Sequence, residues 1–334
     1  MPLTDSPKAD SLKIITGSYS SFSKGNTTSK LTNVHMVYIF FGSLIISLFV
    51  IFIFNFIFNS LDNQKQTIVN KKSASVELLD LRNFNTFYVL EKAKATFPII
   101  NDYEAQAIAV LDVYSNRIIY EKNAEKRMPI ASITKMVTTK ILYDTVNLNG
   151  ITTITNQAAQ YDGSSLVLRS GEKFSNRDLI KAAIIPSNNQ GLYAIQDPEK
   201  TVRQANEYIQ ALRLRDTYIS NPAGFDDNGR NYSTARDVLH IAKVFFNNQE
   251  LRDYARIERS EIRELTTNRE IPIYNTNDFL RIKYTPVLAG KTGTTEKAGQ
   301  NLCILVEKNN KRYIIVILGS TNRYSDAIKI IDRL

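Results

Sequence analysis

The chain has 334 residues, of which 43% are hydrophobic and 22% charged, so it is long enough to bury a sizeable core in one or two domains. Its formal net charge is +9, but no basic stripe interleaved with aromatic residues is present, which argues against nucleic-acid binding. Two histidines and one cysteine are too few for a typical zinc site, so we expect neither a metal nor another cofactor.

The N-terminal part of the chain predicts a membrane anchor. Residues 1–36 are rich in Ser, Thr, Gly and Lys, and we expect them to form a disordered cytoplasmic tail. Val37–Phe58 is apolar and uncharged, and about 20 such residues span a lipid bilayer as a helix. We therefore predict an uncleaved transmembrane anchor over residues 37–61. The tail carries four lysines against three on the other flank, which favours an extracytoplasmic C-terminal part in a single-pass cell-membrane protein.

Residues 62–96 are polar to mixed and predict a stalk, and a globular domain over residues 97–334 follows. Ala107–Val113 and Arg117–Glu121 flank a Ser-Asn turn and predict a strand–turn–strand unit. Further strands are expected over Val287–Thr294, Gln300–Glu307 and Tyr313–Leu318, and helices over Ser132–Val146, Arg177–Ile185, Glu199–Leu212, Ser233–Phe246 and Arg323–Leu334. Because strands from both ends surround a helical middle, we predict an α+β fold: one antiparallel β-sheet flanked by helices, with a helical insertion.

Three short motifs carry the chemistry of the predicted domain. They are Ser132-x-x-Lys135, Ser187-x-Asn189 and Lys291-Thr292-Gly293, in this order along the chain. Together they supply a nucleophilic hydroxyl, two amines and a polar hydroxyl–amide pair. This inventory suits serine acyl transfer in which a lysine, in place of a histidine, accepts the proton.

Each motif also has an ordinary structural explanation. Ser132 can be a helix N-cap followed by an exposed lysine, Ser187 and Asn189 can belong to a polar turn, and Lys291 can be a solvated strand end. The Ser-x-x-Lys pattern also occurs twice elsewhere, so order and structural context have to decide. A Ser-His-Asp triad has at most one candidate base, His240, and that residue lies in a predicted amphipathic helix where a packing role is expected.

The spacing of the first motif favours the chemical interpretation. Lys135 lies one turn after Ser132 on the same face of a predicted helix, so its amine is expected near the hydroxyl. The helix N-terminus favours negative charge on the serine oxygen. A second cation, Lys291, would lower the pKa of Lys135 and leave a neutral amine as the base.

From Phe97 to the C-terminus the chain resembles the serine D-alanyl-D-alanine carboxypeptidases, the low-molecular-mass penicillin-binding proteins. Besides the three motifs, the resemblance is carried by Asn221–Phe225, by Ser233–Asp237, and by Thr294-Thr295 with the later Ala298-Gly299. It implies the penicillin-binding protein/β-lactamase-like transpeptidase fold, with peptidoglycan stem peptides as substrates and β-lactam antibiotics as covalent inhibitors.

The resemblance also implies a role for each motif residue. Ser132 would be the acylated nucleophile and Lys135 its base, while Ser187 and Asn189 would relay a proton and hold the substrate. The third motif forms the rest of the implied site: Lys291 and Thr292 would engage the substrate carboxylate, Gly293 and Thr294 would border the bound peptide, and the backbone N–H groups of Ser132 and Thr294 would form the oxyanion hole.

The sequence therefore predicts a membrane-anchored DD-peptidase that releases the terminal D-alanine through a Ser132 acyl-enzyme. Three alternatives stay open: an endopeptidase that cuts peptidoglycan crosslinks, a serine β-lactamase, and a catalytically silent wall-binding module. The β-lactamase needs a deacylating glutamate, and no Glu-x-x-Leu-Asn pattern is present. Two departures from the family pattern, Gln190-Gly191 and a shortened segment over residues 195–203, are expected to affect the substrate cleft. Because the sequence ends at Leu334, we expect the C-terminal β-domain of many relatives to be missing.

Overall fold

The computed structural model describes residues 102–334, the two-residue strand β1 (Glu91–Lys92) and Ile53. The predicted tail lies outside the described residues, and so do the predicted anchor Val37–Phe58 apart from Ile53 and the predicted stalk apart from Glu91–Lys92. Among the described residues, no helix is both long enough and apolar enough to cross a membrane.

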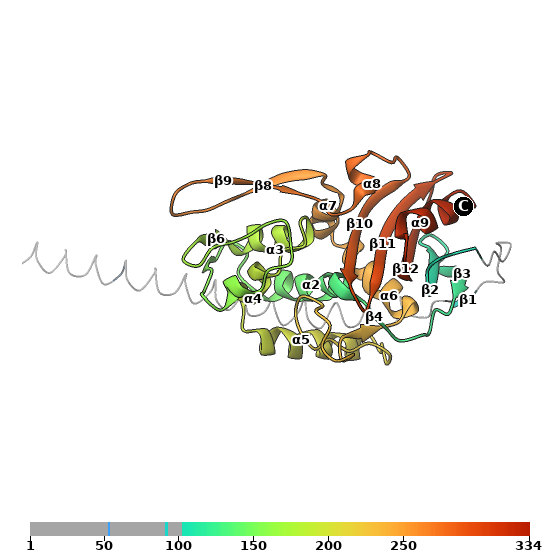
Figure 1. The fold of residues 1–334 in the computed structure, drawn as a ribbon, viewed down its shortest axis with the longest axis horizontal. Coiled ribbons are helices and arrows are strands. Elements are labelled where there is room, and N and C mark those ends of the chain that lie inside the picture. The colour runs from blue at the N-terminus through green and yellow to red at the C-terminus, as the bar shows by residue number, and fades with distance from the viewer. Residues whose placement is uncertain (1–52, 54–90, 93–101) are drawn as a thin grey trace, which may run out of the picture. The chain divides into compact units, whose positions relative to one another are not determined.

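A six-stranded sheet lies at the centre of the described fold, in the order β1-β3-β2-β12-β11-β10 (Figure 1). Its neighbouring strands pair antiparallel, except that β1 runs parallel to β3 at one edge. The long strands are β2 (Ala107–Asp112), β3 (Arg117–Lys122), β10 (Val287–Thr295), β11 (Gly299–Lys308) and β12 (Lys311–Ser320). Pairing of β2 with β12 brings the two ends of the folded segment together, as expected from the sequence.

The side chains of the sheet alternate between two buried faces. Ile314 and Val316 of β12 belong to a core shared with the helical part, whereas Ile315 and Ile317 belong to a second core with the C-terminal helix. Helix α6 (Ala235–Asn247) contacts β2 and β12, while α9 (Arg323–Ile331) contacts β11 and β12, and the short α8 (Asp278–Arg281) contacts β10. Burial on both faces explains why these strands are nearly continuously apolar.

The helical part lies between β3 and β10 in the sequence. Its longer helices are α2 (Lys135–Thr145), α3 (Asn176–Ile184), α5 (Pro198–Ala211) and α7 (Gln249–Arg256), with the shorter α4 (Gln190–Ile195), and 3-10 turns η1 (Ala131–Thr134) and η2 (Ala158–Gln160). Two small sheets pair β4 (Met128–Pro129) with β7 (Tyr232–Ser233) and β5 (Ile151–Thr153) with β6 (Lys173–Ser175). A hairpin of β8 (Arg259–Arg263) and β9 (Glu270–Tyr274) extends over α3 towards β6 (Figure 1).

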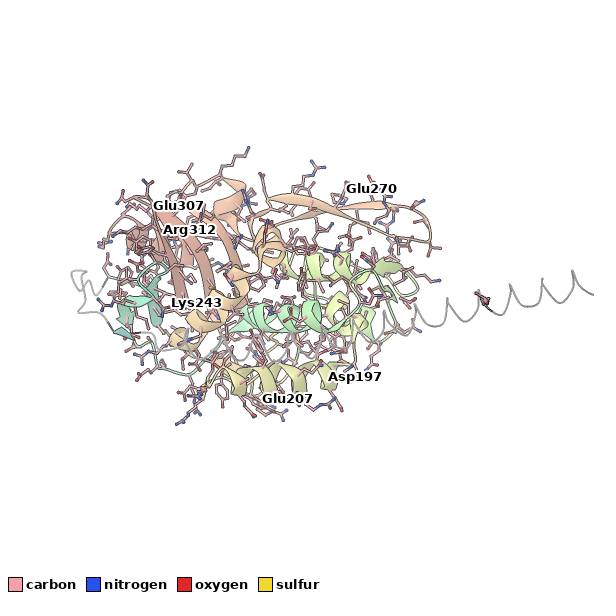
Figure 2. All side chains as sticks on the ribbon, turned by 180° about the vertical axis from the view of Figure 1, so that it is seen from behind. Asp197, Glu207, Lys243, Glu270, Glu307 and Arg312 are labelled. Atoms are coloured by element: carbon pink, nitrogen blue, oxygen red, sulfur yellow. The ribbon has the colours of Figure 1, made fainter. Side chains whose placement is uncertain are left out.

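Polar caps set where the predicted helices begin. The Thr234 side chain accepts a hydrogen bond from the backbone of Asp237 at the start of α6, and Asp197 caps α5, which has proline at its first position. Charged side chains cover the outer surface; Glu207 extends from α5, and Glu307 pairs with Arg312 across the β11–β12 turn (Figure 2).

The predicted α+β architecture, an antiparallel sheet flanked by helices with a helical insertion, is confirmed, and three local expectations need correction. The predicted helix Ser132–Val146 is divided, because Ser132 lies in η1 and α2 begins at Lys135. Ser132 is consequently not an N-cap. Helix α4 and the β8–β9 hairpin were not predicted, since a helix of six residues is too short to show a repeating apolar pattern and charged residues interrupt the apolar alternation of the hairpin.

Candidate active site

The first motif forms one hydrogen-bonded pair. Nζ of Lys135 donates to Oγ of Ser132 at 2.7 Å and to the backbone oxygen of Ala223 at 2.8 Å. The Lys135 side chain is fully buried, whereas Ser132 is partly exposed. The amine is therefore enclosed by the protein, whereas part of Ser132 reaches solvent.

Burial determines the charge of the Lys135 amine. Removal of the amine from water disfavours its charged form and lowers the pKa of Lys135 well below its usual value. The positive charge of Lys291 lowers the pKa further, in the direction expected from the sequence, although burial is the larger cause. A neutral amine has a lone pair, so it can accept the proton that the Ser132 hydroxyl loses.

A second amine–hydroxyl pair joins the other two motifs. Nζ of Lys291, on β10, donates to Oγ of Ser187 at 2.9 Å and to the backbone oxygen of Thr292 at 2.9 Å. Burial and the charge of Arg323 lower the pKa of Lys291 to about 7. Lys291 can therefore gain or lose a proton near neutral pH.

Asn189 contributes to the site from the loop between α3 and α4. Its amide nitrogen donates to the backbone oxygen of Asp162, and the side chain is almost fully buried. Ser187 has a positive φ of 62°, an uncommon conformation for a residue with a side chain. Ser187 thus contacts Lys291, and Asn189 holds the loop that contains Asp162.

The end of the third motif is fixed by an arginine that the motifs did not indicate. Nη1 of Arg323 donates to the side-chain oxygen of Thr294 at 2.9 Å and to the backbone oxygen of Gly293 at 3.1 Å. The hydroxyl of Thr292 lies 2.6 Å from that of Thr276. Arg323 begins a helix far along the sequence, and Ala223 acts through its backbone oxygen, so spacing carries no signal for either.

Two glycines allow the backbone to close around Ser132. A Cβ on Gly293 would lie 2.9 Å from the backbone nitrogen of Ser132, which shows how closely β10 approaches the η1 turn. A Cβ on Gly224, where φ is +88°, would lie 1.9 Å from the backbone oxygen of Ala131. Ala131 itself has a φ of 48°. This strained turn persists because the surrounding backbone determines its position.

The remaining sequence expectations concern residues outside the three motifs. His240 is buried and burial lowers its pKa to about 4, which agrees with a packing role. Residues 102–334 contain no group of three or more His, Cys, Asp or Glu side chains arranged to hold a metal ion. Gln190, one of the two departures noted in the sequence, binds the backbone of Ala159 and Leu168 through its side-chain amide and so supports a loop.

The close contact at Gly224 gives a testable prediction. Gly224→Ala forces a methyl group against the Ala131 carbonyl, and we expect the free energy of unfolding to fall by roughly 3 kcal/mol or more. Gly229→Ala is the matched control, because Gly229 also has a positive φ but no atom within 4 Å of the added Cβ. The control should lose only about 1 kcal/mol. Urea unfolding measures both, and equal losses would contradict the packing described above.

Comparison with known proteins places this geometry in a family. Residues 92–322 match the family model described as D-alanyl-D-alanine carboxypeptidase. The D-alanyl-D-alanine carboxypeptidase DacF of Bacillus subtilis is 27% identical over 244 residues, which cover 69% of this chain and 62% of the relative. DacA of Escherichia coli K12 is 28% identical over 242 residues, which cover 68% and 59%. The matched region thus spans about six tenths of the length of these relatives.

Solved structures show the same fold. A mutant of the Streptomyces K15 DD-transpeptidase superposes with a TM-score of 0.65 at 26% identity, covering 71% of this chain and 98% of that one. The D-alanyl-D-alanine carboxypeptidase of Mycobacterium tuberculosis H37Rv superposes with a TM-score of 0.66 at 21% identity, covering 71% and 93%. The family match extends over most of the described fold and contains all three motifs, so the chain belongs to the D-alanyl-D-alanine carboxypeptidase family.

Proposed function

We propose that the chain is a serine DD-peptidase that removes the terminal D-alanine from peptidoglycan stem peptides. The observation that carries this proposal is the 2.7 Å hydrogen bond between the buried Lys135 amine and the Ser132 hydroxyl. A partly exposed hydroxyl is an activated nucleophile when it lies next to an amine that burial keeps neutral. Family membership supports the same reaction class.

In the proposed reaction, Oγ of Ser132 attacks the carbonyl carbon of the last peptide bond while its proton passes to Nζ of Lys135. The backbone N–H groups of Ser132 and Thr294 stabilise the oxyanion, which fits the close approach of β10 to the η1 turn at Gly293. The carbon–nitrogen bond breaks as the departing amine takes up a proton, which Ser187 relays, and D-alanine leaves. Water then hydrolyses the Ser132 ester, with a lysine again accepting the proton.

The positive end of the site suits a free carboxylate. Lys291 donates to the first residue of the Thr292–Thr294 segment and Arg323 to the last, and both supply positive charge where the C-terminal carboxylate of the substrate would bind. Asn189 would hold the backbone of the peptide. β-Lactam antibiotics, which carry a similar carboxylate, would acylate the same serine.

The location of the reaction is part of the proposal. Peptidoglycan lies outside the cytoplasmic membrane, and the uncharged apolar run Val37–Phe58 would anchor the chain as one transmembrane helix. The lysine-rich tail would then be cytoplasmic and the catalytic domain extracytoplasmic.

A second candidate, cleavage of peptidoglycan crosslinks, is favoured by one comparison. A D-alanyl-D-alanine endopeptidase of Pseudomonas aeruginosa is 24% identical over 239 residues, covering 70% of this chain and 76% of the relative. Because Arg323 and Lys291 favour a free carboxylate, we expect kcat/KM for a monomeric pentapeptide to exceed that for a crosslinked muropeptide by about tenfold or more. Digestion of both purified substrates, followed by chromatography, measures the ratio, and a reversed ratio would favour the endopeptidase.

The nucleophile assignment predicts the site of covalent labelling. Ser132→Ala should abolish attachment of fluorescent penicillin, because no other hydroxyl in the described structure accepts a hydrogen bond from Lys135. Ser170→Ala is a suitable control, since Ser170 heads another Ser-x-x-Lys pattern and is exposed. Gel fluorescence and mass spectrometry of the adduct check both variants. Labelling that survives Ser132→Ala would contradict the assignment.

The cation at Lys291 predicts a shift in pH dependence. Its charge lowers the pKa of Lys135, so Lys291→Met should raise that pKa and move the acidic limb of penicillin acylation to higher pH. The same substitution in the exposed Lys297 should leave the limb in place. Acylation rate constants measured from about pH 5 to about pH 10 test this. An acidic limb that stays fixed, or moves to lower pH, in Lys291→Met would show that the two amines do not interact.

A further inference from the structure

Three consecutive side chains after Ser187 hold one loop, the β5–β6 loop (residues 154–172). Nδ2 of Asn188 donates to the backbone oxygen of Leu166 at 3.0 Å, and the Asn189 amide donates to the backbone oxygen of Asp162. Gln190, next along the chain, is only 1% exposed. The start of α4 is therefore joined to the loop through side-chain amides at successive positions.

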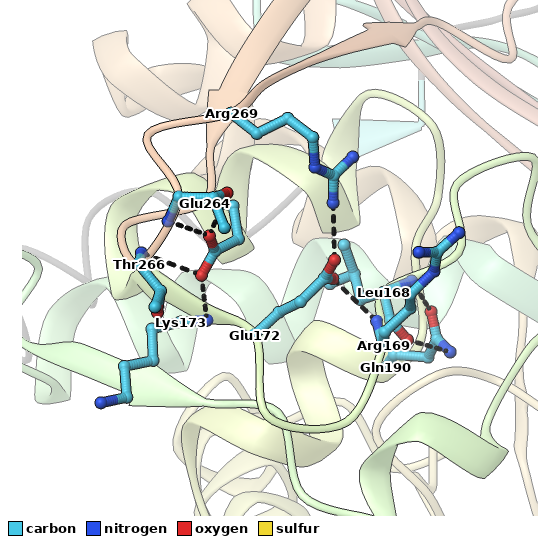
Figure 3. Close-up of polar contacts among 9 residues, drawn as sticks. Leu168, Arg169, Glu172, Lys173, Gln190, Glu264, Thr266 and Arg269 are labelled. Atoms are coloured by element: carbon cyan, nitrogen blue, oxygen red, sulfur yellow. Dashed lines mark hydrogen bonds and ion pairs between the residues drawn. The ribbon is translucent and has the colours of Figure 1, made fainter.

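Gln190 makes the most complete set of these contacts. Its Oε1 accepts from the backbone nitrogen of Leu168 at 2.7 Å, and its Nε2 donates to the backbone oxygen of Leu168 at 3.0 Å (Figure 3). Nε2 also donates to the backbone oxygen of Ala159 at 2.8 Å. The remaining hydrogen-bond partner of Oε1 is the Asn188 amide, 3.3 Å away. All of these partners are uncharged, and the amide bridges two points of the loop that lie nine residues apart in sequence.

The far end of the loop is held by the turn of the β8–β9 hairpin. The buried carboxylate of Glu264 accepts from the backbone nitrogens of Lys173 at 3.0 Å, Thr266 at 3.0 Å and Thr267 at 2.7 Å. These hydrogen bonds keep the pKa of Glu264 well below its usual value. The backbone nitrogen of Leu265 donates in return to the backbone oxygen of Lys173 at 2.8 Å. The hairpin turn is thus fixed to the strand that follows the loop.

An ion pair extends this attachment into the loop itself. Nη2 of Arg269, in the hairpin turn, lies 2.6 Å from Oε1 of Glu172, and Oε2 of Glu172 accepts from the backbone nitrogen of Arg169 at 2.8 Å (Figure 3). Arg169 is the residue after Leu168, which Gln190 holds on both its backbone groups. The contacts therefore run without a gap from the hairpin turn to the start of α4.

The held loop lies beside the candidate active site. Its Tyr161 ring stacks on the Tyr193 ring at 3.5 Å between centroids, and lies 6.3 Å from the ring of Phe225, two residues after Ala223. Ala223 carries the backbone oxygen that accepts from Lys135. A displacement of the loop would consequently disturb both Asn189 and the segment that positions the base.

We propose that Gln190 is a positioning residue, which clamps the β5–β6 loop against the Ser187–Asn189 segment, and that the β8–β9 hairpin turn is the outer anchor of the same loop. The inference rests on the proposed acyl transfer, because the loop is taken to form one wall of the cleft in which that reaction occurs. It assigns a role to the hairpin and to a position that the sequence marks only as a departure from the family pattern.

Two substitutions at Gln190 test the clamp. Gln190→Leu keeps the bulk but removes every hydrogen bond to Leu168 and Ala159, so we expect faster amide hydrogen exchange over residues 159–168 and a fall of about tenfold or more in the penicillin acylation rate constant. Gln190→Glu places a carboxylate against two backbone oxygens, and should cause a similar loss at alkaline pH.

A return of function at acidic pH distinguishes the clamp from general destabilisation. When protonated, the carboxyl group in Gln190→Glu can again donate to a backbone oxygen while accepting from the Leu168 nitrogen. The ratio of variant to wild-type acylation, and the protection of the loop, should therefore both rise as the pH falls. Gln190→Leu should show no such rise, since it has no group that titrates.

The hairpin anchor has its own matched pair of variants. Arg269→Ala removes the ion pair to Glu172, whereas Arg263→Ala removes a pair to Glu270 within the strands of the same hairpin. The two arginine side chains are similarly exposed, at 50% and 55%. We expect Arg269→Ala alone to speed exchange over residues 166–172 and to slow acylation by about threefold.

The exchange measurement separates this inference from the proposed function. If wild-type protein is not acylated, the proposed function fails, but the clamp still stands or falls by loop protection. Unchanged exchange over residues 159–168 in Gln190→Leu would overturn the clamp, and so would faster exchange accompanied by normal acylation. Equal effects of Arg269→Ala and Arg263→Ala would overturn the role of the hairpin turn.

Discussion

The burial of a single amine is the constraint on which the site depends. Lys135 has no exposed surface, and its Nζ has two oxygen neighbours, the Ser132 hydroxyl and the Ala223 carbonyl. An ammonium group in such a place is costly, so the folded protein favours the neutral form, and the neutral form is the one that can take a proton from serine. Burial disfavours the charged form of this lysine, and it thereby provides the base of the proposed reaction.

The rest of the fold keeps that arrangement in place. The η1 turn with Ser132 is held between a loop and a strand, and Gly224 and Gly293 permit both to approach more closely than a side chain would allow. The central sheet, buried on both faces, fixes β10 and therefore Lys291, while α2 carries Lys135. The helical part contributes Ser187 and, through the amides that follow it, holds the loop beside the candidate site. The residues of the candidate site are therefore shared between the sheet and the helical insertion.

Local patterns in the sequence predicted the main strands and the longer helices, and one of the two amine–hydroxyl pairs. Ser132 and Lys135 are one helical turn apart, so their proximity follows from spacing alone, and long alternating or apolar segments located the main strands. The contact between Lys291 and Ser187 joins positions 104 residues apart, and only the tertiary fold creates it. Residue type likewise gave no sign of the Ala223 carbonyl or of Arg323. The membrane anchor at Val37–Phe58 stays a prediction, because it rests on hydrophobicity alone.

The protonation state of Lys135 tests the proposed mechanism most directly. In protein with isotope-labelled lysine, the Cε and Nζ resonances of Lys135, assigned by comparison with a Lys135→Arg variant, can be followed through a pH titration. Burial of Lys135 predicts a titration midpoint well below that of an exposed lysine, with a neutral amine at the pH where penicillin reacts. A Lys135 resonance that stays in the charged form up to the ordinary pKa of lysine would contradict it, because a protonated amine cannot act as the base for Ser132.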